Sequence, residues 1–115
     1  MNANKSLGNW GENKASSFLK DQGFTILQKN LSYPFGEVDI IASKKNILYF
    51  VEVKTRTCDK YGSGAELITQ RKIERIKKVA ETYIHEHSLD TEVRVALISI
   101  YKSGEQVSID WLPVK

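Results

Sequence analysis

Apolar residues change their spacing several times along the chain, and the changes mark the predicted helices. Over residues 5–22, apolar or small side chains recur every three or four positions, which predicts a helix that ends at Gly23. A second helix is predicted over residues 64–86, because Ser63 and Glu66 have the spacing of an N-terminal capping box and an apolar stripe follows them.

Five other stretches are rich in β-branched and aromatic residues and are predicted to be strands. Pro34 and Gly36 favour a turn between the first two, and Gly104 favours a hairpin turn between the last two. Short connections between the first three strands predict an antiparallel meander, so the order of elements is α-β-β-β-α-β-β. The predicted strands cover residues 25–31, 37–43, 47–55, 92–101 and 106–112.

Small residues in the first helix predict that it packs closely against its neighbour. Gly8, Gly11 and Ala15 fall on the face that also carries its apolar side chains. Glycine destabilises a helix interior but lets the backbone approach another element. We therefore expect this helix to be set by its packing more than by its intrinsic helix propensity.

Composition and charge limit the number of domains and the class of protein that this pattern can represent. A chain of 115 residues is long enough for one domain with its own core, and we expect residues 1–115 to form a single domain. The one cysteine, Cys58, excludes an internal disulfide, and neither a secretory signal nor a membrane-spanning run is visible. We expect a cytoplasmic protein without membrane contact; its net charge of +3 permits a polyanionic partner without requiring one.

Charged residues interrupt two of the predicted strands on one face each. Alternation places Glu37 and Asp39 together on one strand, and Glu52 and Lys54 together on the next. If the two strands are hairpin neighbours, Asp39 and Glu52 lie side by side and repel by about 4 kcal/mol at an effective dielectric near 20. A cation must offset this repulsion, and Lys54 alone is one candidate. An exposed ion pair of Glu52 with Lys54 or Lys44 is the plain alternative.

A divalent cation such as Mg²⁺ is the other candidate, because it binds one or two carboxylates together with water and phosphate oxygens. Asp39 and Glu52 would then be its ligands. In metal-assisted hydrolysis the ion makes water more acidic, and a nearby ammonium orients the water or stabilises the transition state. Lys54 fits that role.

Two helical residues extend this candidate site. Lys72 falls inside the apolar stripe of the second helix, so its side chain either passes the sheet edge to solvent or reaches the acidic pair. Glu12 lies at the border of the packed face of the first helix, where the helical pattern alone favours a solvated side chain. Several basic residues could contact nucleic-acid phosphates, although such runs are usually solvated. These are Arg56, Lys60, Arg71, Arg75 and Lys78.

Three motifs together resemble a known family. Gly11-Glu12, then GEVDII from Gly36, then FVEVKTR from Phe50, followed by Lys72 and Ala80, are similar to the YraN-like family of small bacterial proteins. That family is similar to archaeal Holliday-junction resolvases and belongs to the restriction-endonuclease-like, PD-(D/E)XK, superfamily. The resemblance covers residues 8–100, and the second and third motifs are specific as a pair.

The resemblance implies a restriction-endonuclease-like αβββαβ core, in which two helices flank a central mixed sheet with an added C-terminal strand. It implies that Asp39 and Glu52 bind Mg²⁺ or Mn²⁺ with Glu12, and that the Val53 carbonyl is a further ligand. Lys54 would be the catalytic lysine, and Lys72 falls where related nucleases carry Gln or Lys near the site. One departure is Ala96, which stands where these proteins often have aspartate.

The resulting hypothesis is a metal-dependent endonuclease that acts on DNA, with branched or structured DNA as a candidate substrate. A non-catalytic nucleic-acid-binding module on the same fold is the first alternative. A protein-interaction domain with a buried ionic network is the second. A homodimer is suggested only by analogy with resolvases, which cut two strands.

Overall fold

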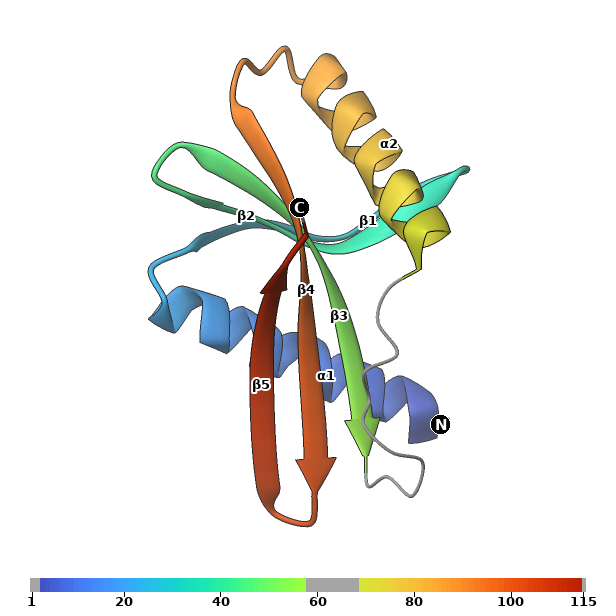
Figure 1. The fold of residues 1–115 in the computed structure, drawn as a ribbon, viewed down its shortest axis with the longest axis vertical. Coiled ribbons are helices and arrows are strands. Elements are labelled where there is room, and N and C mark those ends of the chain that lie inside the picture. Colours follow the sequence, from blue (N-terminus) through green and yellow to red (C-terminus); the bar gives the residue numbers. More distant parts are fainter. Residues whose placement is uncertain (1–2, 58–68, 115) are drawn as a thin grey trace.

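A five-stranded sheet with strand order β1-β2-β3-β4-β5 forms the centre of the molecule (Figure 1). The structure is a computed structural model that describes residues 3–57 and 69–114. Within these residues, no helix combines the length and the apolar character needed to cross a membrane. The elements are α1 (Ala3–Asp21), β1 (Thr25–Tyr33), β2 (Gly36–Lys44), β3 (Ile47–Thr57), α2 (Gln70–Glu86), β4 (Glu92–Ser103) and β5 (Gln106–Pro113).

The sheet is mixed, as the resemblance implied. Strands β1, β2 and β3 form an antiparallel meander, β3 pairs with β4 in parallel, and β5 adds antiparallel to β4. The return from β3 to β4 passes through α2, because a parallel neighbour requires a crossover connection. This is the predicted αβββαβ order with one additional C-terminal strand.

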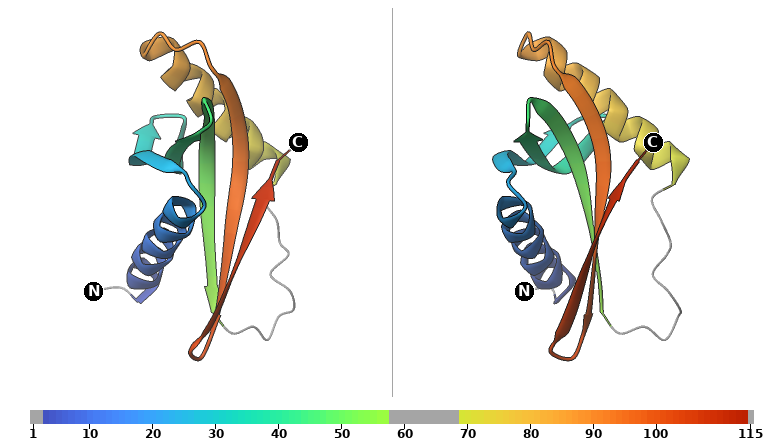
Figure 2. Two further views of the ribbon diagram at one scale, coloured as in Figure 1. Left: turned by 90° about the vertical axis from the view of Figure 1, so that its left-hand side faces the viewer. Right: turned by 60° about the vertical axis from the view of Figure 1, so that its left-hand side comes forward.

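The two helices cover opposite faces of the sheet, which divides the core in two (Figure 2). On the α2 face, Ile76, Val79 and Tyr83 pack against Ile41 and Phe50. The other cluster lies under α1 and is made of small and β-branched residues around one leucine. Its buried members are Ala15, Leu19, Ile40, Ala42, Val51, Ala96, Ile98 and Ile100.

The predicted element boundaries hold to within two residues except at the start of α2. That helix begins at Gln70, and extended Thr69 is its N-cap, whose hydroxyl accepts a hydrogen bond from the Lys72 amide at 3.2 Å. The predicted start at residue 64 is therefore wrong. Ser63 and Glu66, on which that prediction rested, lie outside the described residues. Threonine is a good N-cap residue, but nothing in the local pattern distinguished it from Ser63.

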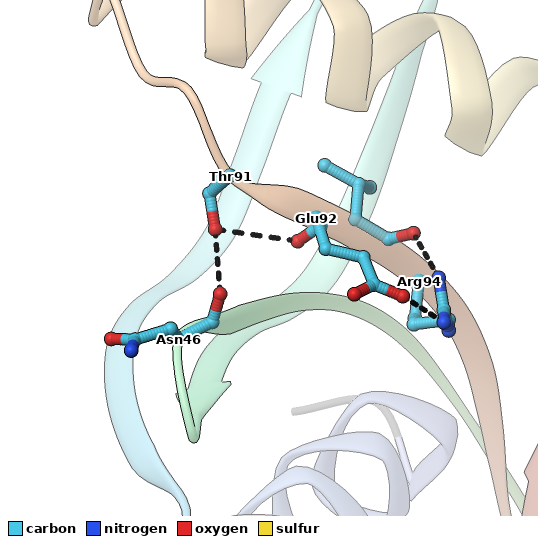
Figure 3. A network of polar contacts seen from close by, with 5 residues as sticks. Asn46, Thr91, Glu92 and Arg94 are labelled. Atoms are coloured by element: carbon cyan, nitrogen blue, oxygen red, sulfur yellow. Dashed lines mark hydrogen bonds and ion pairs between the residues drawn. The ribbon is translucent and has the colours of Figure 1, made fainter.

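The C-terminal departure from the family motif lies away from the carboxylates. Arg94, two residues before Ala96, is exposed at the start of β4 and forms an ion pair with Glu92 (Figure 3). Nearby, the Thr91 hydroxyl donates a hydrogen bond to the Asn46 carbonyl at 2.8 Å (Figure 3). Ala96 is fully buried on the α1 side, opposite Val51 in the β3–β4 register. Alternation along β3 puts Val51 and Glu52 on opposite faces, so Ala96 and Glu52 do not share a face.

Close packing of α1 depends on Gly11. A Cβ placed on Gly11 would overlap the Thr55 hydroxyl of β3 and come within 3.2 Å of its methyl group. Ala15 is likewise buried, as the sequence predicted. The prediction is wrong for Gly8, which is exposed and has nothing within 4 Å of the position that a Cβ would occupy. Helix α1 therefore touches the sheet at its second small residue but not at its first.

Gly11→Ala is expected to destabilise the fold. Overpacking typically costs about 1–3 kcal/mol, and the better helix propensity of alanine returns up to about 1 kcal/mol. The net expectation is a free energy of unfolding lowered by roughly 1–2 kcal/mol in urea denaturation. Gly8→Ala is the matched control, because the same change in open space should leave stability unchanged or raise it. Equal stability of the two variants would contradict a close contact between α1 and β3.

Candidate functional site

The candidate site lies where β2 and β3 separate. Their ladder begins at the turn of Lys45 and Asn46, both with positive φ, and its last pair is Ile40 with Val51. Figure 1 shows the two strands diverging beyond this region. The next residues, Asp39 and Glu52, border a cavity of about 900 Å³ that is also lined by residues of α1, α2 and the β1–β2 turn.

Asp39 bridges the two strands beyond the end of their ladder. Its Oδ2 accepts a hydrogen bond from the Val53 amide at 2.7 Å, so a side chain replaces the missing backbone contact. Val53 thus contacts the Asp39 carboxylate through its N–H. The Val53 carbonyl, which the resemblance suggested as a metal ligand, stays a prediction.

Glu52 is a buried carboxylate with a cationic partner. It is 7% exposed, and its Oε2 lies 2.5 Å from Nζ of Lys72 on α2. Lys72 therefore reaches the acidic pair. Its place in the helix allowed this position or one past the sheet edge. Hydrogen bonding to Glu52 raises the pKa of Lys72, which keeps the ammonium charged. Lys44, the other suggested partner, instead donates to the Gln22 carbonyl at 2.6 Å.

Burial raises the pKa of Asp39 from 3.8 to about 7, and the neighbouring Glu52 carboxylate adds to the rise. The Val53 amide opposes it by stabilising the ionised form; Glu12 raises the pKa slightly and Lys72 lowers it. In many active sites, one of two adjacent, partly desolvated carboxyl groups has a raised pKa of this kind. Near neutral pH, the site therefore favours an added proton or an added cation.

The raised pKa predicts that stability falls as pH rises from about 4 to 7. In this window Asp39 is ionised in the unfolded chain but protonated in the folded one, so the folded state binds more protons. Integration over the window gives a loss of up to about 4 kcal/mol. Urea denaturation of the metal-free protein between these pH values measures it.

Asp39→Asn is the control for this pH dependence, because asparagine cannot titrate but can still accept the Val53 hydrogen bond. The difference in free energy of unfolding between this variant and the wild type should grow toward neutral pH. Asp110→Asn, an exposed change on β5, should follow the wild type. Parallel curves for all three proteins would show that Asp39 titrates normally.

The two remaining members of the predicted site also line the cavity. Glu12 is partly buried on α1, and its charge contributes to the pKa of Asp39. Lys54 is exposed on β3, two residues beyond Glu52 and on the same face by strand alternation. One cavity thus unites the predicted residues of α1, β2, β3 and α2.

The donors fit a divalent cation of the oxygen-binding kind. Asp39 and Glu52 provide two carboxylates beside an open space, which is the usual protein contribution to a Mg²⁺ site. Among residues 3–57 and 69–114, no three Asp, Glu, His or Cys side chains approach closely enough to form a cluster of metal ligands. A cation here would therefore rely on two side chains, with water or a substrate phosphate completing its shell.

The predicted nucleic-acid-binding residues are distributed unevenly around the cavity. Arg75 lines it, and Lys78 lies near it with Nζ 5.0 Å from the centroid of the Phe35 ring. Arg71 is exposed on the first turn of α2, and Arg56 is partly buried on β3. Lys60 lies outside the described residues. The cavity does not include Arg71 or Arg56 in its lining.

Sequence reasoning missed the aromatic wall of the cavity. Tyr33 and Phe35, at the β1–β2 turn, line it together with the carboxylates. The sequence identified this segment as a turn from Pro34 and Gly36, which is confirmed. Two aromatic residues next to such a turn were the available indication, but the packing of the turn along α2 brings them to the site.

Comparisons with known proteins identify the family but no activity. UPF0102 protein FP2501 of Flavobacterium psychrophilum is 36% identical over 96% of this chain and 92% of its own, and a UPF0102 protein of Dictyoglomus turgidum is 42% identical over 96% of both. The structure of Hjc, a Holliday junction resolvase from Archaeoglobus fulgidus, aligns with 91% of this chain and 75% of its own at 17% identity and a TM-score of 0.49. Likeness at that level does not transfer an activity. Residues 11–100 match the uncharacterised protein family UPF0102, and the chain belongs to that family.

Proposed function

We propose that this protein is a metal-dependent nuclease that hydrolyses phosphodiester bonds in DNA. The observation that carries the proposal is the opposition of Asp39 and Glu52 at the parting of β2 and β3, beside one cavity that also reaches Lys54 and Lys72. The resemblance of the GEVDII and FVEVKTR motifs to PD-(D/E)XK nucleases supports the same chemistry. We further propose that the chain acts in the cytoplasm as a single domain.

In this proposal Asp39 and Glu52 would hold Mg²⁺ or Mn²⁺, and Glu12 would add negative charge nearby without being a third ligand. The bound ion supplies charge neutralisation at the scissile phosphate and a more acidic water. Lys54 would orient the attacking water or stabilise charge on the phosphate oxygens, because its side chain lines the same cavity as the two carboxylates. Attack forms a bond from the water oxygen to phosphorus and breaks the bond from phosphorus to the leaving sugar oxygen. The attacking water loses one proton to solvent, and the leaving oxygen takes up one proton from solvent to become a hydroxyl.

Lys72 has a second role in this proposal. Its ammonium offsets the negative charge of Glu52, so the carboxylates remain together without a metal ion. With DNA bound, the Lys72 ammonium would be within reach of a substrate phosphate, which attracts it. Arg75 lines the same cavity and would contact a neighbouring phosphate.

Cleavage of a DNA panel tests the proposed function. Linear, nicked and four-way-junction DNAs are incubated with the protein and Mg²⁺ or Mn²⁺, and the products are resolved on denaturing gels. Cleavage that requires the metal and is lost in Asp39→Ala and Lys54→Ala supports the site. Cleavage that survives both substitutions would sink this assignment.

A non-catalytic nucleic-acid-binding module is the second candidate function. The exposed basic side chains of Arg71, Arg75 and Lys78 on α2 favour it. It predicts salt-dependent DNA binding that a chelator does not change, together with uncut DNA in the whole panel. Binding in EDTA therefore separates it from the nuclease, whose tight substrate complex should need the metal.

A further inference from the structure

The cavity extends well beyond the carboxylates, to the turn that joins β1 and β2. Tyr33 and Phe35 form this end, and their rings are stacked with centroids 5.3 Å apart and planes inclined by 8°. Both side chains are only partly buried. A cavity of about 900 Å³ is larger than a metal ion and one phosphate require, and it falls within the range that holds whole small ligands.

The aromatic pair is held in place by α2. The Tyr33 hydroxyl donates to Glu86 at 2.6 Å near the C-terminal end of the helix. A Cβ on Gly36, the residue after Phe35, would come within 3.3 Å of Val79. The turn therefore packs along the same helix that carries Lys72 and Arg75, so the rings and the proposed phosphate contacts have fixed relative positions.

We propose that Phe35, supported by Tyr33, is a stacking site for an unpaired nucleobase next to the scissile phosphate. This inference rests on the proposed function and names its substrate class: DNA with at least one unpaired nucleotide at the cleavage point. A base inside a duplex has both faces covered by its neighbours, so only an extruded or unpaired base can stack on a protein ring. Perfectly paired DNA then leaves this end of the cavity unused.

A base that stacks on Phe35 must replace the Lys78 ammonium on that ring, and the Lys78 contact is weak enough to allow this exchange. Its Nζ lies 5.0 Å from the Phe35 ring centroid, and the side chain is exposed. A surface cation–π contact is weaker than stacking of a base on an aromatic ring, so the base displaces the ammonium. The released ammonium remains beside the bound strand and can pair with its phosphate.

Binding of three matched DNAs tests the proposal. One is a fully paired duplex, the second carries a single unpaired thymidine, and the third has an abasic spacer at that position. Fluorescence anisotropy with Ca²⁺ in place of Mg²⁺ gives the dissociation constants without cleavage. We expect the wild type to bind the unpaired thymidine about tenfold more tightly than the abasic spacer, the size expected for one stacked base.

Two substitutions separate stacking from folding. Phe35→Leu keeps an apolar side chain against α2 but removes the ring, and it should abolish the preference for thymidine over the spacer. Phe35→Trp should retain the preference. Tyr101→Leu removes an exposed aromatic ring of β4 that does not line the cavity, and it should behave as the wild type.

Several outcomes overturn the inference, and they differ from a failure of the proposed function. An unchanged preference in Phe35→Leu, or equal binding of thymidine and spacer by the wild type, excludes Phe35 as a stacking site even if metal-dependent cleavage occurs. A preference that depends on Phe35 without cleavage of any DNA would uphold the stacking site and reject the nuclease.

Discussion

Asp39→Asn is expected to eliminate metal-dependent cleavage. The variant loses one of the two carboxylates at the end of the β2–β3 ladder, and with it one of the two proposed ligands of the metal ion. Such stabilisation amounts to several kcal/mol of the barrier, so kcat/KM should fall by at least about a thousandfold. Single-turnover cleavage of the best substrate of the DNA panel measures the loss.

Folding and metal binding are measured on the same variant to identify the cause. Asparagine retains the acceptor for the Val53 amide, so thermal denaturation should show an intact fold. Calorimetry should show weaker Mn²⁺ binding than in the wild type. Asp110→Asn removes an exposed carboxylate on β5 and should retain both binding and cleavage. Full Mn²⁺ affinity in Asp39→Asn would show that Asp39 is not a ligand.

Lys54→Met is expected to separate catalysis from metal binding. The ammonium lies on the cavity wall but is exposed, so methionine can replace its chain without leaving a buried charge unpaired. Loss of one preorganised group that stabilises the transition state lowers kcat by about 10²–10³-fold. Cleavage at saturating DNA gives kcat, and calorimetry gives the Mn²⁺ affinity, which should be retained.

Two lysines provide contrasts for this result. Lys29→Met changes an exposed strand lysine outside the cavity lining and should leave kcat unchanged. Lys72→Met should reduce stability as well as activity, because it removes the partner of the buried Glu52. If Lys54→Met lost Mn²⁺ binding along with cleavage, the residue would belong to the metal site and not to the chemistry.

The pairing of Asp39 with Glu52 could be predicted because it depends on local rules. Alternation fixes the face of each residue, and a short turn fixes the register of two hairpin strands. The contact of Lys72 with the acidic pair was one of two positions that the sequence allowed, since a lysine within an apolar stripe needs a partner or a path to solvent. The mixed sheet and its flanking helices followed from the resemblance of three motifs, and the structure confirms them.

Other parts of the site depend on contacts that no local pattern contains. Phe35 reaches the cavity because the β1–β2 turn packs along α2, a contact between segments far apart in sequence. Gly8 resembled Gly11 in spacing, yet only the path of β3 decides which glycine is touched. The start of α2 could not be predicted, because Ser63 and Thr69 are N-cap residues of similar strength.

The contact between Gly11 and Thr55 has a consequence for the carboxylate beside it. Glu12 follows Gly11 directly, so the depth at which α1 sits on β3 also determines how far Glu12 projects toward Asp39. A bulkier residue at position 11 would push α1 away from Thr55 and move Glu12 with it. A change of side-chain size at the uncharged position 11 would therefore alter the contribution of Glu12 to the pKa of Asp39.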